Sequence, residues 1–257
     1  MSNTMSCSLK KLTTISLRTA LCLLVLNSNL LLAETSVYQK AIEHPSRPAG
    51  DLKQDINRKP LSILPFAKIK AGAKVLEIGA GGGYTTELVS RIIGNTGHIY
   101  AETLSLERIK GNRLSNVTAL RRHKLYQLPE VLGENGVEEG QLDVIIIFFA
   151  LHDVMMNTRI DQDDFLGNLY KLLKPGGHFV VLDNAGEPDS GLRDTRKLHR
   201  IGENYVKRKV ESAGFKFDDE TKILRNPEDK LNESWRSIRG KQDRFAFRFV
   251  KPYKRTI

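Results

Sequence analysis

Apolar runs alternate along this chain with polar stretches that have helical spacing. Most of the runs are short and continuous, which is typical of parallel strands buried on both faces. Strands are predicted at residues 75–78, 97–102, 116–120, 141–149, 178–183, 215–223 and 244–250, and helices at 87–93, 106–114, 161–173 and 203–213. This alternation predicts an α/β fold with helices on both faces of a mostly parallel sheet.

Three parts of the chain differ in character. Residues 1–33 are basic and then apolar, residues 34–70 are expected to form a helical extension, and residues 71–257 suit one α/β domain. Pro60 is expected to end or kink a helix within the extension, because proline lacks the N–H that continues a helix.

A turn rich in glycine follows the strand at 75–78 and precedes a helix. Glycine allows positive φ and leaves no Cβ between backbone and ligand, and a helix N-terminus favours a hydrogen-bond acceptor or a negative group. A dinucleotide fingerprint, G-x-G-x-x-G, would need a glycine where Tyr84 stands. The spacing is instead Glu77-x-Gly79-x-Gly81-x-Gly83.

That spacing resembles motif I of class I methyltransferases that use S-adenosylmethionine (SAM). Leu-Lys-Pro-Gly-Gly at residues 173–177, before a strand, is a further feature of that superfamily. The resemblance implies a Rossmann-like sheet of order 3-2-1-4-5-7-6 with strand 7 antiparallel, and SAM as the cofactor. An acid beneath the glycine turn can hold the α-ammonium of SAM. The expected cofactor-binding residues are Glu77, Gly79, Ala80, Gly81, Gly83, Tyr84, Glu102 and Phe149.

Glu102 ends the second predicted strand, some 20 residues beyond the glycines. A carboxylate in that position can accept hydrogen bonds from both ribose hydroxyls, although an acid can also stand at a strand end by chance. After the third strand, methyltransferases often carry an acid near the adenine amino group. Residues 121–126 contain none, so adenine recognition here would depend on backbone groups near Lys124 and Leu125.

The fourth predicted strand runs into His152 and Asp153. Its carboxyl end lies beside the first strand, at the switch point where α/β sheets bind ligands. His152 is therefore a candidate general base and Asp153 its orienting partner. A capping or packing role for His152 is the alternative, and Phe149 could flank the cofactor.

Further polar residues are candidates for a lid or an acceptor site. Asp55 and Arg58 recur at near-helical spacing, which suits either a surface ion pair or a lid over the ligand. Asp183, Arg193 and His199 lie on or near the loop after the fifth strand and could meet the acceptor. The stretch from 224 to 244 is interpreted as an exposed excursion.

The N-terminal segment is interpreted as an export signal, with cleavage expected after Ala33 and an uncleaved membrane anchor as the alternative. Both cysteines, Cys7 and Cys22, fall within it, so a cleaved chain would have neither a disulfide nor a zinc–cysteine site. No metal site is expected. We therefore expect a periplasmic or secreted protein that tolerates an oxidising compartment.

The formal net charge of +10 permits attraction to an anionic membrane surface, whereas no nucleic-acid-binding module is recognisable. The chain resembles a group of methyltransferases that carry signal peptides. The resemblance runs from about Arg47 to Pro252 and includes the segments Leu198–Ile201, Leu224–Pro227 and Arg239–Arg244. We expect SN2 methyl transfer to a small-molecule or envelope acceptor. A non-catalytic nucleoside- or ligand-binding protein of the same fold remains the alternative, and Tyr84 disfavours a nicotinamide oxidoreductase.

Overall fold

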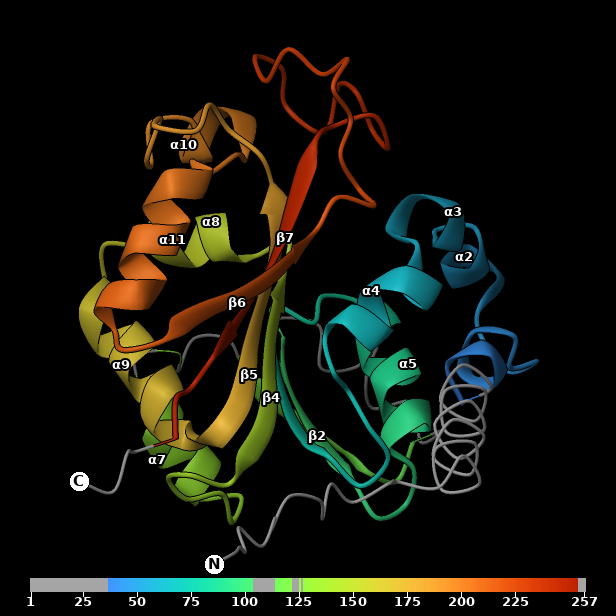
Figure 1. Ribbon diagram of the computed structural model, residues 1–257. Helices are drawn as coiled ribbons and strands as arrows, with labels where there is room; N and C mark the ends of the chain where they lie inside the picture. Colours follow the sequence, from blue (N-terminus) through green and yellow to red (C-terminus); the bar gives the residue numbers. More distant parts are fainter. Residues whose placement is uncertain (1–36, 104–113, 122–124, 126, 254–257) are drawn as a thin grey trace, which may run out of the picture.

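The computed structural model describes residues 37–103, 114–121, 125 and 127–253 (Figure 1). At its centre is a seven-stranded sheet of order β3-β2-β1-β4-β5-β7-β6, in which β7 runs antiparallel to both neighbours. The strands are β1 Lys74–Ile78, β2 His98–Thr103, β3 Val117–Arg121, β4 Leu142–Phe148, β5 Leu173–Asn184, β6 Lys216–Thr221 and β7 Arg244–Val250. The predicted fold class and strand order are confirmed.

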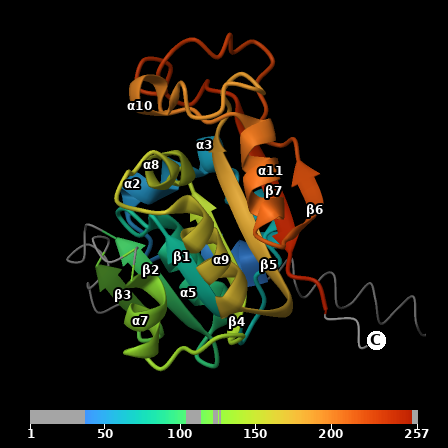
Figure 2. The same cartoon turned by 90° about the vertical axis from the view of Figure 1, so that its left-hand side faces the viewer.

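Helices cover both faces of the sheet (Figures 1 and 2). One face carries α4 (Pro60–Phe66) and α5 (Tyr84–Ile93). The other carries α7 (Leu128–Gly133), α8 (Leu151–Met155), α9 (Gln162–Leu172), α10 (Thr195–Leu198) and α11 (Glu203–Ser212). The central strand β4 supplies apolar side chains to a core cluster on each face, which explains its continuous apolar run.

The fifth strand begins earlier than the sequence indicated. Leu173 pairs with Leu142, and His178 with Val144, so residues 174–177 bulge outward opposite one residue of β4. Gly176 in this bulge has φ +79°, a conformation that glycine adopts without strain. The proline–glycine segment therefore interrupts the strand pairing rather than forming a turn before the strand. The expected helix over 106–114 lies almost entirely outside the described residues.

The N-terminal extension is helical over 37–42 and in the short helices α2 (Ala49–Leu52), α3 (Asp55–Arg58) and α4. Pro60 is the first residue of α4, and Lys59 before it has φ +46°, so the predicted break is present. No helix within the described residues is long and apolar enough to cross a membrane. The predicted leader at 1–33 lies outside those residues.

The stretch from 224 to 243 is mostly exposed or only partly buried, as expected, but it is fixed to the domain by ion pairs. The buried guanidinium of Arg200 pairs with Asp229 at 2.8 Å and donates to the backbone oxygen of Glu233. Arg225 pairs with both Glu203 and Asp243. These ion pairs hold the stretch over the carboxyl edge of the sheet.

Candidate functional site

The glycine turn between β1 and α5 forms the base of the site. Gly79, Gly81 and Gly83 all have positive φ. A Cβ on Gly79 would lie 2.3 Å from Cβ of Ala150, so this glycine is required by close packing against the chain after β4. A Cβ on Gly81 would meet nothing nearer than 3.9 Å. The backbone at Gly81 is therefore open to a ligand, while Gly79 serves the fold.

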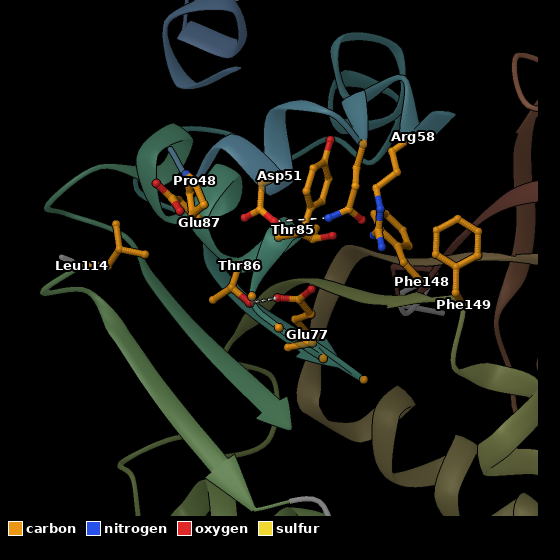
Figure 3. Close-up of a pocket in the computed structure, with 17 residues that line it drawn as sticks. Pro48, Asp51, Arg58, Glu77, Thr85, Thr86, Glu87, Leu114, Phe148 and Phe149 are labelled. Atoms are coloured by element: carbon orange, nitrogen blue, oxygen red, sulfur yellow. Dashed lines mark hydrogen bonds between the residues drawn. The ribbon is translucent and has the colours of Figure 1, made fainter. Parts of the chain in front are cut away.

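A cavity of about 560 Å³ lies above this turn (Figure 3). Its floor is the glycine turn and the first turn of α5, and its roof comes from the N-terminal extension. Among the predicted cofactor residues, those that line it are Glu77, Gly79, Ala80, Gly81, Gly83, Tyr84 and Phe149. Most of the residues that line the cavity therefore belong to the segments in which cofactor-binding residues were predicted.

Glu77 is almost fully buried at the edge of this cavity, and its Oε2 accepts a 2.6 Å hydrogen bond from the Thr86 hydroxyl. Burial raises the pKa of Glu77 to about 7; the Thr86 hydrogen bond and the charge of Arg58 lower it, and the charge of Glu102 raises it. The side chain can therefore change protonation state near neutral pH, and an incoming cation would favour its charged form.

Glu102 stands at the end of β2 beside the turn, as predicted, but it is not among the residues that line the cavity. Its Oε2 accepts a 2.9 Å hydrogen bond from the backbone N–H of Gly79, and the residue is 1% exposed. In this structure Glu102 supports the glycine turn, and its contact with ribose stays a prediction. Of residues 121–126, where adenine recognition was left open, only 121 and 125 are described.

The N-terminal extension is held on the glycine turn by three side chains. Both Nη atoms of Arg47 donate 2.8 Å hydrogen bonds to the carboxylate of Asp55, and the Tyr84 hydroxyl donates a 2.6 Å bond to Oδ1. Burial by itself raises the pKa of Asp55, but the hydrogen bonds from Arg47 and Tyr84 outweigh it, and the pKa is lowered. Asp55 therefore anchors the extension and does not line the cavity.

Arg58 lines the cavity from the N-terminal extension. Its guanidinium carbon lies 4.5 Å from the centroid of the Tyr84 ring and 5.4 Å from that of Phe149. The side chain points from α3 down toward Phe148 and Phe149 in Figure 3. Asp55 thus forms an ion pair, but with the buried Arg47 and not on an open surface, and the lid role of Arg58 stays a prediction.

A second cavity of about 520 Å³ adjoins the first. Gln54, Arg58 and Phe149 line both cavities. Phe149 has φ +60°, which is rare for a residue with a large side chain and places a strained backbone where the two cavities meet. The second cavity is also lined by Lys53, Asn57, His152, Asp153, Asn184, His199, Trp235, Arg236, Arg239, Gly240, Gln242 and Arg244.

His152 reaches this second cavity from α8, held by a carboxylate that the sequence did not single out for that role. Its Nδ1 lies 2.8 Å from Oδ1 of Asp183, and its backbone N–H donates to Oδ2 of the same residue at 2.9 Å. Asp153, the expected orienting partner, lies instead on the other side of the ring, with Oδ1 3.4 Å from Nε2. Nδ1 of His199 lies 3.2 Å from Nε2.

His152, Asp153 and His199 form a group that could hold a metal ion, because one ligand atom from each lies within 4.8 Å of the others. The pKa of His199 is lowered mainly by burial and further by the nearby charge of His152. The three residues come from two segments that the sequence analysis treated separately. Their convergence at one cavity is a finding of the structure.

Two of the residues predicted to meet the acceptor, Asp183 and Arg193, do not line the second cavity. Asp183 is fully buried beneath His152, so its carboxylate faces the histidine and not the cavity. Arg193 is exposed, pairs with the adjacent Asp194 and lines neither cavity. His199 does line the second cavity.

Four cationic or aromatic residues of the second cavity were not predicted as site residues: Trp235, Arg236, Arg239 and Arg244. The segment Arg239–Arg244 was noted as part of the family resemblance, and this signal could have directed attention to it.

Comparisons with known proteins match a large part of this chain. Residues 76–179 match the family described as "Methyltransferase domain". A curated relative, the ubiquinone/menaquinone biosynthesis C-methyltransferase UbiE of Vibrio parahaemolyticus, is 28% identical over 139 residues, which are 51% of this chain and 50% of the relative. The chain thus spans about half the length of the curated relatives it matches.

Two solved structures have a similar fold. A SAM-dependent methyltransferase from Aquifex aeolicus superposes with a TM-score of 0.56 at 20% identity, covering 80% of this chain and 98% of the other. A chain from the complex between the Haloferax volcanii Trm112 methyltransferase activator and a methyltransferase gives a TM-score of 0.59 at 14% identity, covering 81% and 96%. The sheet order and these structures show that the chain has the fold of class I SAM-dependent methyltransferases, residues 76–179 match a methyltransferase domain, and these matches support SAM as the cofactor.

Proposed function

We propose that this protein transfers a methyl group from SAM, bound in the cavity over the glycine turn, to an acceptor bound in the cavity beside His152. The observation that carries the proposal is the junction of the two cavities, which share Gln54, Arg58 and Phe149 as lining residues. A methyl donor and an acceptor held on either side of that junction would meet there.

The donor side follows from the first cavity. The open backbone at Gly81 and the first turn of α5 suit the methionine part of SAM, and the carboxylate of Glu77 would hold its α-ammonium. Glu102 would accept hydrogen bonds from the ribose hydroxyls after a small rearrangement, because it now holds the N–H of Gly79.

The acceptor side follows from the His152–Asp183 pair. A buried carboxylate that accepts from Nδ1 fixes the imidazole tautomer in which Nε2 carries a lone pair. As the acceptor atom attacks the methyl carbon in line with the sulfonium, its proton would move to Nε2, and S-adenosylhomocysteine would leave. Asp183 would stabilise the imidazolium that forms.

Calorimetric titration of the purified protein with SAM, S-adenosylhomocysteine and NAD tests the donor assignment. We expect micromolar affinity for SAM, about −8 kcal/mol, and no heat with NAD. The alternative is a binding protein of the same fold. It would be favoured if SAM binds while the methyl group of labelled SAM is never transferred to any component of a cell-envelope extract.

Export is a separate part of the proposal. The basic and apolar composition of residues 1–33 supports removal of this segment after Ala33 and a periplasmic or secreted location. Such a location requires a supply of SAM outside the cytosol, where it is made. N-terminal sequencing of protein from the native host provides the test, and a chain that still begins at Met1 in the cytosol would contradict export.

A further inference from the structure

The second cavity has an unusual charge balance. Five of its lining residues are cationic: Lys53, Arg58, Arg236, Arg239 and Arg244. The acidic residue of the lining is Asp153. Three of these cations come from the stretch at 236–244 and two from the N-terminal extension. The two segments meet where Nη1 of Arg244 donates a 2.8 Å hydrogen bond to the backbone oxygen of Asn57.

Arg244 is the buried arginine in this group, and it differs from the other buried arginines of the described chain. Arg47, Arg200 and Arg248 are each paired with an aspartate at 3.1 Å or less. Arg244 is 6% exposed, yet among the described residues it forms no salt bridge, and its Nε has no hydrogen-bond partner. A buried guanidinium without a carboxylate is unfavourable unless another anion offsets its desolvation.

Arg58 increases this imbalance. It also forms no salt bridge with any described residue, and both its guanidinium and that of Arg244 lie near the Phe149 ring, 5.4 and 5.8 Å from the centroid. Burial lowers the pKa of Arg244, and the like charge of Arg58 lowers it further; the charge of Asp243, which is itself paired with Arg225, raises it but does not reverse the shift. The positively charged guanidinium groups of Arg58 and Arg244 are therefore held close together at the junction of the cavities.

We propose that the second cavity binds an acceptor through an anionic group, a carboxylate or a phosphate, held by Arg244 and Arg58. A guanidinium presents parallel N–H donors that match either oxyanion. Arg236 and Arg239, both exposed, would attract the anion toward the cavity. This inference rests on the proposed function only in taking the bound molecule to be the methyl acceptor, because anion binding in this cavity does not require SAM.

The test is calorimetric titration of the SAM-free full chain with three probes of similar shape: benzoate, phenyl phosphate and the neutral benzamide. We expect at least one of the two anions to bind and benzamide not to bind. The anion that binds more tightly identifies the group. The Arg244→Gln variant should weaken that binding by about tenfold or more, the loss that follows from removing a hydrogen bond between charged groups.

Two further variants keep the test decisive. Arg239→Gln changes an exposed residue and should also weaken anion binding if Arg244→Gln fails to fold. Arg193→Gln removes an exposed arginine outside both cavities and should leave anion binding unchanged. Equal binding of benzamide and the anions, no anion binding at millimolar concentration, or full affinity in both cavity variants would overturn the inference. Loss of SAM binding alone would contradict the proposed function and leave the anion site standing.

Discussion

Nδ1 of His152 lies 2.8 Å from Oδ1 of Asp183, where β4 and β5 end side by side. The second oxygen of the same carboxylate accepts the backbone N–H of His152 at 2.9 Å. Asp183 therefore holds both the ring and the first turn of α8. A histidine fixed in this way can present only Nε2 to the cavity, which is the arrangement that a general base needs.

The first prediction concerns this pair. Asp183→Asn removes the charge that stabilises the imidazolium, so turnover should fall by about 10²–10⁴-fold while SAM affinity changes little. Transfer of label from SAM to a cell-envelope extract, at equal concentrations of folded protein, measures the effect. If the two residues act as a unit, the double variant with His152→Ala should be no slower than His152→Ala alone. Losses that multiply in the double variant would contradict a shared role.

The second prediction separates two glycines. Gly79→Ala should destabilise the fold, because its Cβ would lie 2.3 Å from that of Ala150. Gly81→Ala has space but takes φ +54°, so it should cost only about 1–2 kcal/mol of folding stability, while its Cβ enters the ligand space and weakens SAM binding at least tenfold. Melting temperatures and SAM titrations distinguish the two effects. Normal SAM affinity in a folded Gly81→Ala protein would argue against backbone recognition of the cofactor at this turn.

The third prediction follows from the pKa of Glu77, raised by burial to about 7. The carboxyl is protonated below that pH in the free protein, and only the carboxylate attracts the SAM ammonium. SAM affinity should therefore rise roughly eightfold between about pH 6 and about pH 7.5. In Glu77→Gln the affinity should be lower and nearly independent of pH over this range. An equal pH dependence in that variant would assign the titration to another group.

Glu77 should also affect stability, with the opposite dependence on pH. Its folded-state pKa lies above its ordinary value, so the protonated form is favoured in the folded protein. That contribution is fully present below about pH 4.5 and is lost as pH rises through about 7. The free protein should thus lose stability over the interval in which it gains SAM affinity.

The strand order and the glycine turn were predictable because each depends on a local pattern. A buried parallel strand needs a continuous apolar run, and the turn after β1 needs glycine at fixed spacing. The second cavity has no such local signal. Its two sides come from segments 187 residues apart in the chain at the Arg244–Asn57 hydrogen bond. Likewise, sequence adjacency indicated Asp153 as the partner of His152, whereas strand pairing placed Asp183 there.

The fourth prediction concerns the attachment of the N-terminal extension. Arg47→Ala leaves the Asp55 carboxylate without its bidentate partner, so folding stability should fall by about 1–3 kcal/mol. SAM affinity should fall as well, because Asp51 and Arg58 of the same extension line the cavity over the glycine turn, where SAM is proposed to bind. Limited proteolysis with SAM titration measures both effects. Arg193→Ala, which removes an exposed pair with Asp194, is the matched control and should change neither.

The last prediction concerns metal ions at His152, Asp153 and His199. Their ligand atoms are separated by 3.2, 3.4 and 3.8 Å. Four-coordinate Zn²⁺ with bonds of about 2.0–2.2 Å separates its ligands by about 3.3–3.5 Å, so the group fits this ion with small adjustments.

Zn²⁺ would occupy the Nε2 lone pair that a base must use. If His152 takes the acceptor proton, added Zn²⁺ should inhibit methyl transfer, and EDTA should leave the rate unchanged. Mg²⁺ prefers oxygen ligands and should not inhibit. Asp153→Asn should weaken the inhibition, because it replaces one ligand while keeping the His152–Asp183 pair. Should EDTA abolish transfer and Zn²⁺ restore it, the three residues would form a metal centre, and the proton would have to pass to another group.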